Sequence, residues 1–190
     1  MFDMCCQKMN YITSAYGIPT YALVYEQELI DIANKYPHVT LIERDAATAF
    51  AEGPLQFIYK DVLNVSNEDY LMFLNPCLTF LTPETIVNAI HTFEASGKNY
   101  GTSVKEFKNW LWNDTQEPVN YIDYKRLTTK EITPWYQAAH CFHVFNREDF
   151  QRDGYMLKED DIELLLVPEE ETIDIDTQEE YEFAKWKWEH

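Results

Sequence analysis

The chain has 190 residues, of which 46% are hydrophobic, and its formal net charge is −18. This length allows one substantial hydrophobic core and predicts a single domain over residues 1–190. The negative charge argues against nucleic acid and anionic membranes as partners, because both bind positively charged surfaces. No apolar run approaches the roughly 20 residues that span a bilayer. The four cysteines show no C-x-x-C spacing or disulfide pattern, so we expect a cytoplasmic protein.

Helical and strand patterns alternate along the chain without a linker or a repeat, which is typical of an α/β domain. The run from Tyr70 to Leu74 is apolar throughout, which predicts a central strand covered by helices on both faces. Helices are expected at residues 3–16, 27–36, 54–65 and 83–94 and after residue 176, and strands at residues 21–26, 39–44, 70–75, 99–104 and 138–145.

An aromatic and weakly patterned stretch occupies about residues 105–135. It contains Trp110, Trp112, Tyr121 and Tyr124. Aromatic side chains bring a large contact area at low entropic cost, so these four are candidates for a subunit interface. They fit the protein core equally well, and the sequence leaves both interpretations open.

Two carboxylates, Asp174 and Asp176, are two residues apart in an acidic segment near the C-terminal end. In an extended segment, residues at this spacing project to the same face, so both side chains can bind one hard cation such as Mg²⁺. The alternative is a helix start, because Asp176 and Thr177 precede Glu179 and Glu180 in a capping pattern. Both interpretations remain open at this point.

The segment IDIDT followed by an acidic helix resembles the C-terminal part of the acylneuraminate cytidylyltransferases, the CMP-sialic acid synthetase family. The resemblance extends in order from about Ala22 to Lys185. The other segments that resemble the family are YEQELIDIANKYPHVTLIERD, DYLMFLNPCLTFLTPETIVNAIHTFEASG and ITPWYQAAHCFHVFNREDF.

The resemblance implies a single-domain, three-layer nucleotidyltransferase fold with a mostly parallel central sheet. It implies an enzyme that transfers CMP from CTP to an acidic sugar, with Mg²⁺ held by Asp174 and Asp176. Asn75 would orient the sugar or the base, and Arg44 would contact a phosphate or the ribose. For Arg44, a surface ion pair with a neighbouring acid is an alternative. The family also implies a homodimer formed through the excursion at about 105–135.

The chain departs from the family at its beginning. The family's first strand and its phosphate-binding loop of glycine, serine and lysine have no counterpart, and the five glycines lie scattered along the chain. Cys77 and Leu78 also stand where the family has small hydroxyl residues. Without the loop we expect weak CTP binding, and two further functions stay open. One is a non-catalytic homologue that binds a sugar or nucleotide or serves as a partner subunit, and the other is a structural protein in which the aspartates only cap a helix.

The missing first strand has a structural consequence. In the family it lies between the strands that correspond to residues 21–26 and 70–75. Without it, unpaired backbone groups in the interior would each cost roughly 1–3 kcal/mol. Three solutions are therefore open: the two strands pair directly, another chain supplies the strand, or the natural protein starts upstream of Met1.

Overall fold

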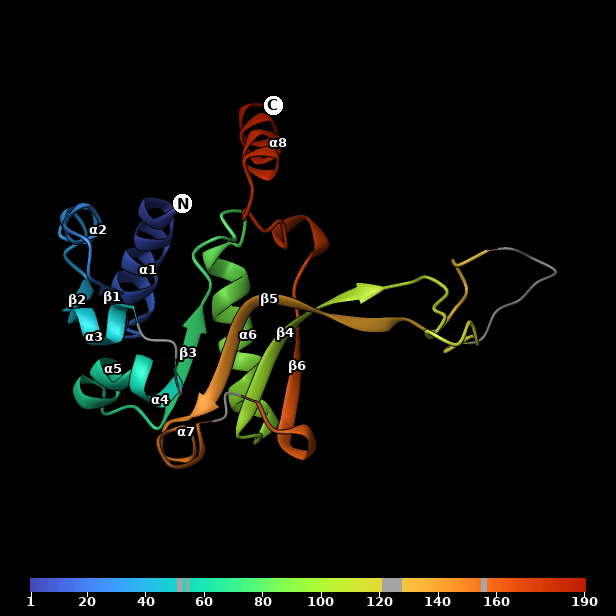
Figure 1. The fold of residues 1–190 in the computed structure, drawn as a ribbon, viewed down its shortest axis with the longest axis horizontal. Coiled ribbons are helices and arrows are strands. Elements are labelled where there is room, and N and C mark those ends of the chain that lie inside the picture. Colours follow the sequence, from blue (N-terminus) through green and yellow to red (C-terminus); the bar gives the residue numbers. More distant parts are fainter. Residues whose placement is uncertain (51–52, 54, 121–127, 155–156) are drawn as a thin grey trace.

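The computed structural model describes residues 1–50, 53, 55–120, 128–154 and 157–190 (Figure 1). The helices are α1 (Phe2–Tyr16), α2 (Gln27–Ala33), α3 (Ala46–Ala49), α4 (Leu55–Ile58), α5 (Lys60–Val65), α6 (Pro83–Ser96), α7 (Arg147–Asp153) and α8 (Gln178–Glu189). The strands are β1 (Thr20–Val24), β2 (Val39–Glu43), β3 (Tyr70–Leu74), β4 (Tyr100–Phe107), β5 (Trp135–Asn146) and β6 (Ile162–Leu166). Two short 3₁₀ helices, Glu159–Asp161 and Glu169–Glu171, flank β6.

The strands form two sheets. One contains β1 and β2 in parallel, and the other has four strands in the order β3-β5-β4-β6. In the second sheet β5 runs antiparallel to β3 and β4, while β4 and β6 are parallel. Strands β3, β4 and β6 therefore share one direction, and the prediction of a mostly parallel α/β fold is confirmed.

The predicted central position of the apolar strand Tyr70–Leu74 is wrong. Strand β3 is the edge of the four-stranded sheet, and among the described residues it pairs only with β5. Strand β1 likewise pairs only with β2. Direct pairing of β1 with β3, one of the three solutions to the missing strand, is therefore not what the structure adopts.

Helices cover both faces of the four-stranded sheet. On one face, Ile86 and Phe93 of α6 and Ile12 of α1 pack in a cluster with Phe142 and Val144 of β5. The next residue of β5, Phe145, points to the opposite face. There it packs with Leu63 of α5 and Phe150 of α7. This alternation along β5 produces the three layers that the resemblance implies.

A third cluster links the two sheets. Cys6 and Met9 of α1 pack there with Ala22 of β1 and Val39 of β2. Leu74, the last residue of β3, packs against this cluster and also against the cluster around α6. The two sheets are thus joined by side-chain packing near the end of β3.

Helix α6 begins and ends where local sequence signals predict. The hydroxyl of Thr82 accepts a hydrogen bond from the backbone amide of Thr85, and Pro83 occupies the first turn. At the other end, Gly97 adopts a left-handed conformation with φ of 67°. These signals fix the direction of α6, whose N-terminus points to the same end of the sheet as the end of β3 (Figure 1).

A two-stranded arm extends from the sheet (Figure 1). Beyond a bulge in β4, Val104 lies opposite Ala138 and Phe107 lies opposite Trp135. Trp112, farther along this excursion, is 52% exposed, so it does not belong to the core. Trp110 is half-buried, and Tyr121 and Tyr124 lie outside the described residues.

The packing predicts that alanine substitution at two positions of the four-stranded sheet lowers the free energy of unfolding by different amounts. Phe142 is fully buried in the cluster around α6, whereas Leu164 of β6 is 45% exposed. We expect Phe142→Ala to lower the free energy of unfolding by about 3–5 kcal/mol, and Leu164→Ala to lower it by less than about 1 kcal/mol. Urea denaturation followed by circular dichroism measures both, and equal losses would contradict this packing.

Candidate metal-binding site

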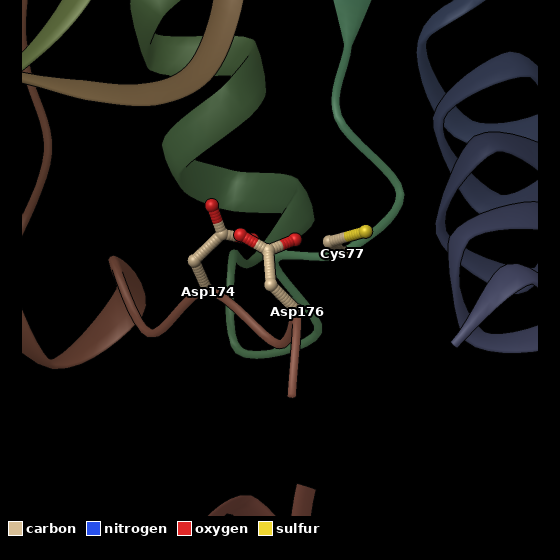
Figure 2. A group of neighbouring side chains, drawn as sticks. All are labelled: Cys77, Asp174 and Asp176. Carbon is tan, nitrogen blue, oxygen red and sulfur yellow. The ribbon is translucent and has the colours of Figure 1, made fainter. Parts of the chain in front are cut away.

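Cys77, Asp174 and Asp176 are neighbours in the folded chain (Figure 2). One ligand atom from each, the thiol sulfur and two carboxylate oxygens, lies within 4.8 Å of the others. Two ligands of one cation lie at most about 4–5 Å apart, twice a typical metal–ligand bond length. The three atoms are therefore spaced closely enough to share a cation.

The two aspartates lie on the same face because side chains alternate in direction along an extended backbone. Ile175, between them, is 6% exposed and turns into the protein, so its neighbours turn the other way. Asp174 is half-buried, and Asp176 is exposed. The predicted convergence of the two carboxylates on one face is confirmed, while their role as metal ligands stays a prediction.

The helix cap next to the aspartates is made by other residues. Thr177 is the N-cap of α8, and its hydroxyl accepts a hydrogen bond from the backbone amide of Glu180. The Glu180 carboxylate in turn accepts hydrogen bonds from the backbone amides of Thr177 and Asp176. The side chains of Asp174 and Asp176 take no part in this capping box, and they remain available for another role.

Asn75 shapes the loop that presents Cys77. Its backbone amide donates to the carbonyl of Cys141 at 2.9 Å, which continues the pairing of β3 with β5. Its side-chain oxygen accepts a hydrogen bond from the backbone amide of Cys77 at 3.0 Å. Asn75 thus lies beside the candidate metal site, and its role as a substrate-binding residue stays a prediction.

Glu171 connects the aspartate segment to the start of α6. Its carboxylate accepts a hydrogen bond from the backbone amide of Thr82 at 2.8 Å. The hydroxyls of Thr82 and Thr85 also donate to it, at 3.2 and 3.0 Å. A carboxylate at a helix N-terminus is stabilised by the free amides and the helix dipole. These bonds attach Glu171 to the start of α6. Glu171 lies three residues before Asp174, so they also restrain the aspartate segment.

Lys8 places a positive charge beside the loop, and no sequence motif identifies it. Its ammonium group donates to the backbone carbonyls of Thr79 at 2.5 Å and Leu78 at 3.5 Å. Burial lowers the pKa of Lys8, and the charge of Glu171 acts in the opposite direction. Lys8 therefore joins α1 to the loop of Cys77 and places a positive charge beside it.

The aspartates affect the titration of the Cys77 thiol. Burial raises the pKa of the Cys77 thiol, and the charges of Asp174 and Asp176 raise it further. Like charges brought this close disfavour one another unless a cation balances them. The arrangement is thus suited to attracting a cation.

Arg44 lies in a different network. Its guanidinium donates to the backbone carbonyls of Thr48 and Ile58, and its buried Nε has no hydrogen-bond partner in the described part of the chain. Among the described residues, the alternative ion pair of Arg44 with Glu43 or Asp45 is not formed, and Asp45 pairs instead with Lys60 at 3.5 Å. Within the described residues, no hydrogen bond or ion pair joins Arg44 to Cys77 or the aspartates, and its contact with a nucleotide stays a prediction.

No protein-family model matches the sequence, and no curated protein matches it. Solved structures do match. The 4-diphosphocytidyl-2C-methyl-D-erythritol synthase of Anaerococcus prevotii matches with a TM-score of 0.67 at 10% identity, over 100% of this chain and 86% of that one. A CMP:2-keto-3-deoxy-manno-octonic acid synthetase complexed with CTP also matches at 0.67 and 10%, over 98% and 87%.

A third match is the 2-C-methyl-D-erythritol 4-phosphate cytidylyltransferase of Francisella tularensis, with a TM-score of 0.59 at 10% identity. It covers 96% of this chain and 87% of that protein. This chain has the fold of these cytidylyltransferases. At such low identity the likeness establishes the fold and leaves the reaction and the substrate open. Among the described residues, no helix has both the length and the apolar character needed to cross a membrane.

The position of Glu171 generates a prediction. We expect Glu171→Ala to lower the free energy of unfolding by about 2 kcal/mol, because three charge-assisted hydrogen bonds at the start of α6 are lost. We also expect a weaker affinity for divalent cations, by about tenfold, because the aspartate segment loses its support. Thermal unfolding and calorimetric cation titration measure the two effects.

The matched control is Glu170→Ala, which removes the same charge one residue earlier, where the side chain is exposed. Only small changes are expected there. Equal effects of the two variants would show that charge alone, and not the contact with α6, determines stability and cation affinity.

Proposed function

We propose that this chain is a cytidylyltransferase-like protein that binds CTP with a divalent cation and transfers CMP to an acidic sugar of the sialic acid type. The observation that supports the proposal is the combination of a cytidylyltransferase fold with paired carboxylates beside the end of β3. In open α/β sheets, ligands bind outside the carboxyl ends of the strands. The candidate metal site lies at that end of β3.

In this proposal Asp174 and Asp176 hold Mg²⁺, which neutralises charge on the phosphate oxygens when bound. The sugar hydroxyl attacks the α-phosphate of CTP, and pyrophosphate leaves. Asn75 orients the sugar or the base, and Arg44 contacts the nucleotide after its guanidinium is released from the carbonyls of Thr48 and Ile58. The two carboxylates fit Mg²⁺, whereas the neighbouring thiol of Cys77 is not a ligand that Mg²⁺ favours.

Positive charge is scarce for a protein that would bind a triphosphate. The chain has 15 lysines and arginines against 33 acidic residues, and its five glycines include no phosphate-binding cluster. Lys8 supplies one cation beside the Cys77 loop. We infer that the cation held by the aspartates and the ammonium group of Lys8 together offset the phosphate charge.

Exposed aromatic side chains on the arm support a homodimer as part of this proposal. Trp112, Trp135 and Tyr136 are 52%, 41% and 53% exposed. Aromatic residues in such positions are enriched at the centres of protein interfaces. The proposed protein works in the cytoplasm, and its partners are CTP, an acidic sugar and a second copy of the chain.

A non-catalytic homologue is the second candidate function. It is favoured by the split between β1 and β3, because each strand presents an edge to which a strand of another chain can add. Such a protein would keep the fold as a partner subunit, with or without weak binding of a sugar or nucleotide. The two candidates differ in whether CTP binds tightly and with a requirement for Mg²⁺.

Isothermal titration with CTP, in the presence and absence of Mg²⁺, tests the proposed function. We expect binding in the micromolar range that requires Mg²⁺ and is lost in the double variant Asp174→Asn/Asp176→Asn, because the cation bridges protein and phosphates. The control Glu169→Gln/Glu170→Gln removes the same charge at exposed positions outside the site. Absence of binding up to millimolar CTP would favour the non-catalytic homologue.

Lys8 gives an independent prediction. We expect Lys8→Met to weaken CTP binding by about tenfold, the usual loss when one charge-assisted contact is removed. Affinity for the free cation should not fall, because Lys8 repels cations. A control is Lys35→Met, since Lys35 lies on the exposed side of the molecule with its side chain 62% accessible. Unchanged CTP binding in Lys8→Met would exclude a phosphate contact at this position.

A further inference from the structure

The thiol of Cys77 is the unusual member of the candidate metal site. It comes from the loop after β3, nearly 100 positions before the aspartates, and yet its sulfur lies within 4.8 Å of a carboxylate oxygen of each. Figure 2 shows the two carboxylates facing the loop that holds Cys77. The set therefore combines two oxygen ligands with one sulfur ligand.

Both loops are held in place before any ligand binds. Asn75 fixes the backbone of Cys77, Lys8 binds the carbonyl of Thr79 two residues later, and Glu171 ties the aspartate segment to α6. Fixed ligands reduce the entropy that ion binding would otherwise cost. The convergence of the three side chains is thus supported from three separate elements.

Two of the three ligating groups have no competing partner. Within the described residues, neither the Cys77 thiol nor the Asp176 carboxylate forms a hydrogen bond or an ion pair. The Asp174 carboxylate accepts only from the backbone amide of Ile175, at 3.0 Å. A cation would therefore compete with this one hydrogen bond at most, and it would balance the repulsion between the two carboxylates.

The possible cations differ in the ligand atoms that they prefer. Mg²⁺ takes oxygen ligands and keeps several waters, so a thiolate adds nothing to its binding. Zn²⁺ and similar borderline cations bind thiolate and carboxylate together, at about 2.3 Å to sulfur and 2.0–2.2 Å to oxygen. A site with three protein ligands also keeps a coordination position open, as in catalytic zinc sites.

We propose that Cys77 is the third ligand of the cation held by Asp174 and Asp176, and that the site prefers a borderline divalent cation such as Zn²⁺ over Mg²⁺. The proposal rests on the metal-binding part of the proposed function and does not require CTP. When the cation binds, the Cys77 thiol loses its proton to solvent, and the sulfur lone pair forms the bond to the metal. The open coordination position is where a phosphate oxygen of a nucleotide would bind.

Cadmium is the probe, because a bond between Cd²⁺ and a thiolate produces a charge-transfer absorption in the ultraviolet. We expect the chain of 190 residues to show this band with one equivalent of Cd²⁺, and Zn²⁺ to displace Cd²⁺ at concentrations where Mg²⁺ does not. Cys77→Ser should abolish the band and weaken Cd²⁺ binding by about tenfold or more. Its affinity for Mg²⁺ should change by less than about threefold, because serine leaves both carboxylates in place.

Three other variants complete the experiment. Asp174→Asn/Asp176→Asn should weaken Cd²⁺ binding as well, whereas Glu169→Gln/Glu170→Gln should leave it unchanged. Cys77→Ala provides a second removal of the thiol, and circular dichroism verifies that each variant folds. A band that persists in Cys77→Ser, or tighter binding of Mg²⁺ than of Zn²⁺ by the natural sequence, would overturn the proposal.

The outcome is separable from that of the CTP titration. A Cd²⁺ band without CTP binding would leave the three-ligand site standing and remove the nucleotide function. CTP binding with Mg²⁺ that is insensitive to Cys77→Ser, without a Cd²⁺ band, would keep the proposed function and remove Cys77 from the site.

Discussion

Glu171 accepts hydrogen bonds from the backbone amide of Thr82 and from the hydroxyls of Thr82 and Thr85, and these bonds join segments 89 residues apart in the chain. The start of α6 needs an acceptor for its free amides, and the aspartate segment needs a fixed attachment to the sheet. One carboxylate meets both needs. The position of Asp174 and Asp176 therefore depends on the same contact that completes α6.

The second constraint is the division of the sheet. Strands β1 and β3 each have a neighbour on one side only, among the residues that the structure describes. The apolar packing of Leu74 against two clusters joins the halves without any backbone pairing between them. Side-chain packing of this kind buries apolar area but does not satisfy strand edges, whose free N–H and C=O groups favour an added strand. The fold of the larger cytidylyltransferases is thus retained with its sheet open.

Local signals made much of the fold predictable. Thr82, Pro83 and Gly97 set the ends of α6 through contacts within a few residues, so the sequence alone was sufficient. The helix expected at 54–65 is instead two short helices, α4 and α5. Strand β6 was not predicted, because its sequence shows no distinct strand pattern. The apolar run Tyr70–Leu74 correctly predicted a strand but not its neighbours, because pairing depends on residues far away in the chain.

The candidate site was likewise predictable only in part from the sequence. The spacing of Asp174 and Asp176 predicted their common face, because backbone alternation is a local property. Lys8 and Cys77 could not be assigned to the site, since Lys8 reaches a carbonyl 71 residues away and Cys77 meets the aspartates only in the folded protein. Arg44 was expected at the nucleotide, but the sequence does not reveal that its guanidinium binds the carbonyls of Thr48 and Ile58.

Charge would link cation binding to nucleotide binding in the proposed function. With a net charge of −18, the chain as a whole repels a triphosphate, and the carboxylates of the site add to this repulsion. A bound divalent cation would neutralise the two carboxylates and remove their repulsion of the phosphates, so the affinity for a nucleotide would follow from the affinity for the ion. A thiolate carries the same negative charge as a carboxylate, but it binds borderline cations more strongly. In the proposed site, Cys77 would help to retain the ion where the surrounding residues contribute little positive charge.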